Sequence, residues 1–138
     1  MDIHLETHDE RRKLSLINIT DSGAETFECR AIVKSGWLEC NRQFFFGRYY
    51  AEEFLKSLIR MNSTFDGVAE LKAEYEDQVI TFTCNKLGRV IVSGEFIEHS
   101  MLSQSMEFRF ETDQTVLPGL INKFELLLKS SFHAPAER

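Results

Sequence analysis

Between residues 38 and 59 the chain reads LECNRQFFFGRYYAEEFLKSLI, and within this stretch the spacing of the apolar residues changes. Up to Phe46 the apolar side chains fall on alternate residues, which is typical of a strand with one buried face. From Ala51 onward they fall three or four residues apart, which predicts an amphipathic helix. The apolar stripe of that helix consists of Ala51, Phe54, Leu55, Leu58 and Ile59. A strand is therefore predicted to lead into a helix near residue 50.

Alternating apolar residues predict further strands on both sides of this junction. The predicted strands cover residues 13–20, 27–34, 37–46, 68–76, 79–85, 89–98 and 106–111. A second helix is predicted after Thr115, its expected N-cap, with Pro118 in the first turn. The order βββ-α-ββββ-α with short connections predicts an α+β fold. We expect a mostly antiparallel sheet of about seven strands with both helices packed on one face.

The length and composition of the chain suit one domain covering residues 1–138. Of its 138 residues 43% are hydrophobic, which is enough for a single core. Residues 1–11 are polar and lack periodicity, so we expect a loose N-terminal arm. Residues 130–138 are expected to form a frayed C-terminal tail.

The formal net charge of −6 argues against a nucleic-acid partner, because phosphates are neutralised by basic side chains. The N-terminus lacks the basic and apolar regions of a signal peptide, and no apolar run approaches the length of a membrane span. We therefore expect a cytoplasmic protein without a membrane partner. The three cysteines, Cys29, Cys40 and Cys84, include no CxxC pair and are expected to be free thiols.

The sequence contains no recognisable set of catalytic, cofactor-binding or metal-binding residues. His4 and His8 are spaced four apart, but the intervening Glu6 is misplaced for the HExxH zinc motif. We therefore expect no enzymatic activity and no cofactor. Binding of another protein is the class of function that remains.

Residues 66–77 carry five acidic side chains and one basic one, a local charge of −4. Strand alternation places Ala69, Leu71, Ala73 and Tyr75 on one face and Glu70, Lys72, Glu74 and Glu76 on the other, with Asp77 following. One interpretation is a solvated strand face that protects a sheet from aggregation. The other is an electrostatic docking strip for a basic protein, formed by Glu70, Glu74, Glu76 and Asp77.

Trp37 is a second candidate for binding. It begins the predicted strand at 37–46 and points away from its Phe-rich face. A tryptophan on an open sheet face can anchor an interface. Burial under a loop or helix is the alternative.

Four segments of the chain resemble one known protein family. They are FLKSL at 54–58, GVAEL at 67–71, GRVIVSG at 88–94 and FRFETDQT at 108–115. Together with their order, they are similar to the WapI-like immunity proteins of bacterial polymorphic toxin and contact-dependent inhibition systems. The resemblance spans about residues 27–128.

The resemblance implies a small cytoplasmic protein that binds and neutralises the C-terminal domain of a cognate bacterial toxin. Many such toxins are nucleases, whose active clefts are basic, and an acidic inhibitor complements a basic cleft. The alternative is a small cytoplasmic enzyme or ligand-binding domain with a pocket between helices and sheet. An immunity gene is expected directly downstream of a toxin gene, whereas an enzyme gene need not be.

Overall fold

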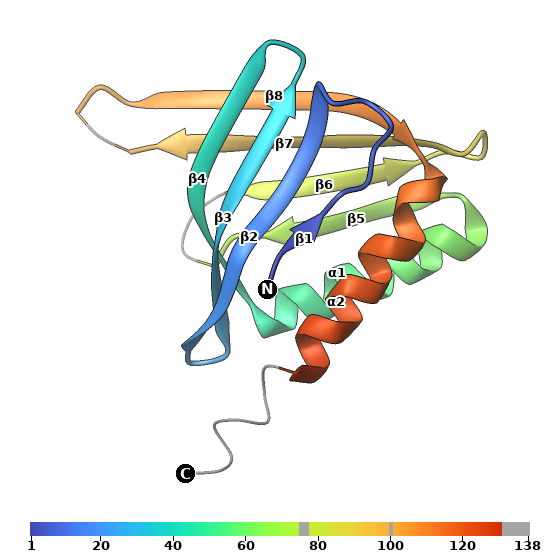
Figure 1. Cartoon of the computed structure of the whole chain (residues 1–138), viewed down its shortest axis with the longest axis horizontal. Helices are drawn as coiled ribbons and strands as arrows, with labels where there is room; N and C mark the ends of the chain where they lie inside the picture. Colours follow the sequence, from blue (N-terminus) through green and yellow to red (C-terminus); the bar gives the residue numbers. More distant parts are fainter. Residues whose placement is uncertain (75–77, 100, 131–138) are drawn as a thin grey trace.

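The computed structural model describes residues 1–74, 78–99 and 101–130 of the chain (Figure 1). Its elements in chain order are β1 (Ile3–His4), β2 (Arg12–Gly23), β3 (Thr26–Ser35), β4 (Leu38–Gly47), α1 (Arg48–Thr64), β5 (Gly67–Lys72), β6 (Val79–Cys84), β7 (Arg89–Glu98), β8 (Gln104–Asp113), a 3-10 turn (Gln114–Val116) and α2 (Leu117–Ser130). The α+β class and the antiparallel pairing are confirmed. The expected frayed tail lies outside the described residues from 131 onward.

The strands form two sheets of four instead of one sheet of about seven. The sheet orders are β1-β2-β3-β4 and β5-β6-β7-β8, and every pair is antiparallel. Figure 1 shows the strands of the two sheets crossing steeply, with α1 and α2 side by side below them. The division falls at α1, because β4 passes into the helix without a break and β5 then begins a new sheet.

The N-terminal segment is ordered, which corrects the expectation of a loose arm over residues 1–11. Ile3 pairs with Leu16, and the Leu5 N–H donates a hydrogen bond to the Leu14 carbonyl at 2.9 Å. Ile3 and Leu5 are both buried. Two apolar residues among charged ones are too few to show a period, and their burial depends on a partner strand that is distant in sequence.

Helix α1 is longer than its apolar spacing predicted, because it extends over residues expected to form a loop. It ends at Phe65, whose φ of 53° is left-handed and whose N–H donates to the Met61 carbonyl. Met61 is buried in place of Ile59, which is exposed. Phe54, Leu58 and Met61 are spaced i, i+4 and i+7, so the buried stripe turns slightly away from Ile59.

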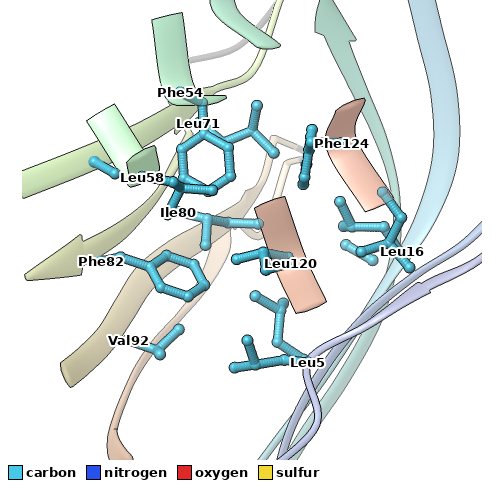
Figure 2. Packing of buried hydrophobic residues seen from close by; sticks show 14 of the residues in the cluster. Leu5, Leu16, Phe54, Leu58, Leu71, Ile80, Phe82, Val92, Leu120 and Phe124 are labelled. Atoms are coloured by element: carbon cyan, nitrogen blue, oxygen red, sulfur yellow. The ribbon is translucent and has the colours of Figure 1, made fainter. Parts of the chain in front are cut away.

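The core lies between the inner faces of the two sheets and the two helices (Figure 2). Phe54 of α1 is central to it, with ring centroids 5.7 Å from Phe82 of β6 and 5.1 Å from Phe124 of α2. Leu16 of β2 and Leu120 of α2 are also buried here. One aromatic side chain thus connects both helices to the second sheet.

The entry to α2 is capped by Asp113 and not by Thr115. The Asp113 carboxylate accepts hydrogen bonds from the hydroxyl of Thr115 and from its N–H, the latter at 2.9 Å. These two hydrogen bonds, the hydroxyl first, lower the pKa of Asp113. The acidic side chain thus begins the 3-10 turn that leads into the helix.

We expect Asp113→Ala to lower the free energy of unfolding by about 1 kcal/mol at pH 7, as for other N-cap losses. The pKa of the Asp113 carboxyl is lower in the folded protein than in the unfolded chain. The ionised carboxylate therefore stabilises the fold fully above the unfolded pKa of about 3.9, and this stabilisation is lost as the pH falls through the folded pKa. Urea unfolding at pH 7 and near pH 2 should show the difference from wild type shrinking in acid. An equal difference at both pH values would contradict a role for the charged form.

Gly94 of β7 lies where two neighbouring strands approach closely. A Cβ at this position would lie 2.7 Å from the Phe108 ring and 2.8 Å from the Val79 carbonyl oxygen. We expect Gly94→Ala to destabilise the fold by about 1–3 kcal/mol through overpacking. Gly119→Ala is the control, since no atom lies within 4 Å of its Cβ position. Thermal unfolding should show a lower midpoint than wild type for Gly94→Ala and not for Gly119→Ala. An unchanged midpoint for Gly94→Ala would refute the close approach.

Candidate functional site

The structure places Glu70 and Glu74 on and just after β5 and places Trp37 in a turn of the first sheet. Glu70 lies on β5, on the face of the second sheet that points away from the core. Glu74 follows β5, and its N–H donates to the Phe45 carbonyl of the first sheet at 2.8 Å. Trp37 lies in the turn between β3 and β4. Glu76 and Asp77 lie outside the described residues. Of the predicted strip, Glu70 and Glu74 are described and exposed, and its binding role stays a prediction.

Glu74 opens onto a groove that the sequence did not predict, which we call the tyrosine groove. It lies between the turn from β2 to β3, the start of α1 and the segment after β5. Its lining residues are Ala24, Glu25, Thr26, Gly47, Arg48, Tyr49, Tyr50, Glu52 and Glu74. Three segments that are distant in sequence thus meet at one opening.

The aromatic part of the tyrosine groove is a pair of neighbouring rings at the start of α1. The rings of Tyr49 and Tyr50 are 5.5 Å apart in an edge-on arrangement. Tyr49 is 66% exposed, which is high for so large a side chain. The ammonium of Lys72 lies 5.8 Å from the centroid of the Tyr50 ring. The tyrosine face therefore already accommodates a cation of this chain.

The charge of the tyrosine groove is negative. Its lining includes the carboxylates of Glu25, Glu52 and Glu74 and the guanidinium of Arg48. Arg48 forms an ion pair with Glu52 at 3.0 Å. The carboxylates of Glu25 and Glu74 remain as the groove's excess of negative charge, so a cationic side chain entering beside Tyr49 would meet both an aromatic face and carboxylates.

Glu74 also has a structural role at the first turn of α1. A Cβ at Gly47, the N-cap, would lie 2.2 Å from the Glu74 Oε1 atom, so the Glu74 carboxylate occupies the space that a side chain there would take. Gly47 provides no side-chain cap, and the first turn of α1 has no acidic residue. A carboxylate here compensates the positive end of the helix dipole. Glu74 therefore contributes to both helix and groove, whereas Glu25 and Tyr49 are free of that constraint.

The turn that carries Glu25 is unusual in its backbone. Ala24 and Glu25 have φ angles of 54° and 58°, a left-handed conformation that costs non-glycine residues about 1 kcal/mol or more each. Asp21 and Gly23 are residues of the types that favour turns. Those residues instead continue strand β2. No pattern in the sequence marks Ala24 and Glu25 as the turn, so this part of the groove could not be anticipated.

A second groove, the tryptophan groove, lies beside Trp37 where the two sheets meet. Its lining residues are Arg12, Ser35, Gly36, Trp37, Ile91, Arg109, Phe110 and Glu111. The Ser35 hydroxyl donates to the Arg109 carbonyl at 3.0 Å, which connects the turn to the edge strand β8. Trp37 is 91% exposed. Burial under a loop or helix is therefore wrong, and because Trp37 lies in a turn and not on a sheet face, its role as an interface anchor stays a prediction.

The space between helices and sheets offers little room for a ligand. The cavity there has room for about one water molecule, and the residues that line it include Ile3, Leu71, Phe82 and Leu120, all apolar. Within residues 1–74, 78–99 and 101–130, no three His, Cys, Asp or Glu side chains come together as metal ligands. Among the described residues, those that line this cavity contribute no polar side chain with which a substrate could be oriented.

The cysteines lie away from both grooves. Cys29, Cys40 and Cys84 are free thiols. Burial raises the pKa of Cys29 to about 12, with a smaller contribution from the negative charge of Glu28. Desolvation also raises the pKa of Cys40 and of Cys84. At neutral pH these thiols are therefore protonated and weakly nucleophilic.

No protein-family model matches the chain, and no curated protein sequence matches it. Among solved structures, a chain from the crystal structures of Trypanosoma bruciei MRP1/MRP2 is similar in fold. The match has a TM-score of 0.52 with 14% sequence identity and covers 99% of this chain and 84% of the other. The similarity extends over the whole arrangement of two sheets and two helices, and at this identity it describes the fold alone. None of the described helices is long and apolar enough to cross a membrane.

Proposed function

We propose that this domain binds and neutralises the C-terminal domain of a cognate bacterial toxin, and that the toxin domain docks at the tyrosine groove. The observation that carries the proposal is the combination of the exposed Tyr49 ring with the carboxylates of Glu25 and Glu74 at one opening. Tyrosine is enriched among residues that dominate protein interfaces. The resemblance to WapI-like immunity proteins supports the same role.

The chemistry of the groove indicates what kind of partner it fits. An arginine or lysine of the partner would lie against the Tyr49 ring and near the carboxylates, as Lys72 already does against Tyr50. The net charge of −6 would attract a basic partner over a longer range and accelerate encounter. A toxin with a basic nucleic-acid-binding cleft meets both conditions. Inhibition then follows from occupying or flanking that cleft, with no catalysis by this protein, and the site of action is the cytoplasm.

The alternative of an enzyme or ligand-binding domain receives no support from the proposed pocket between helices and sheet. That cavity is apolar and holds about one water molecule. A binding role does not require an interior pocket, because both grooves lie on the surface.

Co-expression with the C-terminal toxin domain encoded directly upstream tests the proposal. We expect wild-type protein to restore growth and to elute with the toxin domain as one complex. Tyr49→Ala should lose protection while keeping the wild-type melting temperature, because the side chain is 66% exposed. Failure of the wild-type protein to bind or to protect would refute the function. Full protection by Tyr49→Ala would instead move the docking site away from the tyrosine groove.

A further inference from the structure

The open face of the second sheet carries an ordered pattern of charge. Glu70, Thr81, Ser93 and Arg109 lie side by side across its four strands, one residue from each. Neighbouring strands are about 4.8 Å apart, so Glu70 and Arg109 are about 14 Å from each other at opposite edges. Both side chains are exposed. Within the described residues, neither has an ion-pair partner.

We call each set of residues that lie side by side across the four strands a row. In the next row of the same face the signs of the charges at the two edges are reversed. Lys72 lies at the β5 edge and Glu107 at the β8 edge, with Val79 and Glu95 between them. Along the β5 edge the order of charges is therefore negative then positive, and along the β8 edge it is positive then negative. The two edges of this face are complementary in charge.

The apolar residues of the face are also placed at both edges. Trp37 and Ile91 line the tryptophan groove beside β8. At the β5 edge, Val68 is 53% exposed and lies in the same row as Ile91 and Glu111. The row of Val68 thus ends at Glu111 on β8, and Trp37 lies beside that end in the turn between β3 and β4.

We propose that a second copy of this chain packs on this face, through a two-fold axis parallel to the strands and midway between β6 and β7. Rotation about that axis exchanges the β5 and β8 edges and keeps each row in place. Glu70 of one copy then faces Arg109 of the other. In the next row the positions of Lys72 and Glu107 face each other, with the Lys72 ammonium against the Tyr50 ring of its own copy. Val68 comes to face Glu111 of the second copy, at the edge where Trp37 lies, and each of these contacts occurs twice.

The size of the face predicts a dimer of modest affinity. Four strands at about 4.8 Å and six to ten residues each give a footprint of about 500 Å² per copy. The total of about 1,000 Å² lies at the lower end of specific interfaces. Packed sheets align within about 30°, so the middle row containing Glu70 and Arg109 remains in register best. We therefore expect a concentration-dependent dimer in which this pair decides association.

A charge-exchange experiment tests the dimer with variants that do not disturb the core. Glu70→Arg and Arg109→Glu each place like charges opposite one another in a homodimer, twice per complex. Each variant alone should therefore dimerise at least about tenfold more weakly than wild type. A 1:1 mixture of the two variants should restore the dimer, because every facing pair is again of opposite sign. Sedimentation velocity over a concentration series measures all three samples.

The chain has a single tryptophan, so fluorescence reports directly on the proposed contact. Wild-type Trp37 emission should move to shorter wavelength as dimer forms, and should stay at the exposed position in either variant alone. A wild type that remains monomeric at about 1 mM would overturn the proposal, since weak interfaces of this size associate there. Dimerisation of both single variants, or no dimer in the mixture, would also overturn it. The inference uses residues outside the tyrosine groove, so both variants should still protect against the toxin if the proposed function holds.

Discussion

Association with the cognate toxin domain is expected to slow by at least about tenfold at low salt when Glu25 and Glu74 are both replaced by glutamine. The double change removes the groove's excess carboxylates while keeping side-chain size. Since the attraction is screened by salt, the wild-type association rate should fall as ionic strength rises, and the variant rate should fall much less. Stopped-flow association at two ionic strengths measures both effects.

The control for this variant is the double change Glu53→Gln and Glu125→Gln. Both carboxylates are exposed on helices outside the tyrosine groove, so the net charge changes equally, from −6 to −4, by removal of two negative charges. Equal slowing in both double variants would show that only overall charge matters and that the groove is not the docking site. A melting temperature measured for each variant separates binding from the structural role of Glu74 at α1.

Phe54→Ala is expected to lower the free energy of unfolding by about 3–5 kcal/mol. The side chain is 2% exposed, and its ring contacts Phe82 of the second sheet and Phe124 of α2. Its removal leaves a cavity where three elements meet, and the surrounding strands can close it only in part. Urea unfolding gives the loss directly.

An exposed aromatic serves as the comparison for Phe54. Tyr49→Ala removes a ring of similar size that is 66% exposed, and surface changes of this kind cost at most about 0.5 kcal/mol. A loss below about 1 kcal/mol for Phe54→Ala would mean that the buried face of α1 is misassigned.

Local periodicity was sufficient to predict most elements of this fold. The alternation of Phe27, Cys29, Ala31 and Val33 placed the buried face of β3 correctly, and a helix after residue 115 was also predicted. The division into two sheets could not be predicted, because pairing between distant strands leaves no local pattern. β1 was missed because two residues cannot show a period, and Asp113 was missed because both it and Thr115 are good caps.

For the candidate site, the sequence predicted exposed acidic side chains on and after β5, but not the groove in which three segments meet. Strand alternation placed Glu70 and Glu74 away from Leu71, and both are exposed. Glu25, Tyr49 and Glu74 are each separated by more than twenty residues. They meet only because the ends of β2 and β5 lie near the start of α1. The left-handed turn at Ala24 and Glu25 has no sequence signal. The same nonlocal pairing sets Glu70 opposite Arg109 across the second sheet.

Hydrogen exchange of the protein with and without the toxin domain tests the central claim most directly, because it locates the docked surface on this chain. Docking at the tyrosine groove predicts slower exchange in the complex at the turn around Glu25 and at the first turn of α1 around Tyr49. The turn around Trp37 should be unchanged by the toxin domain. Slower exchange confined to the Trp37 turn, with none at Tyr49, would contradict the account.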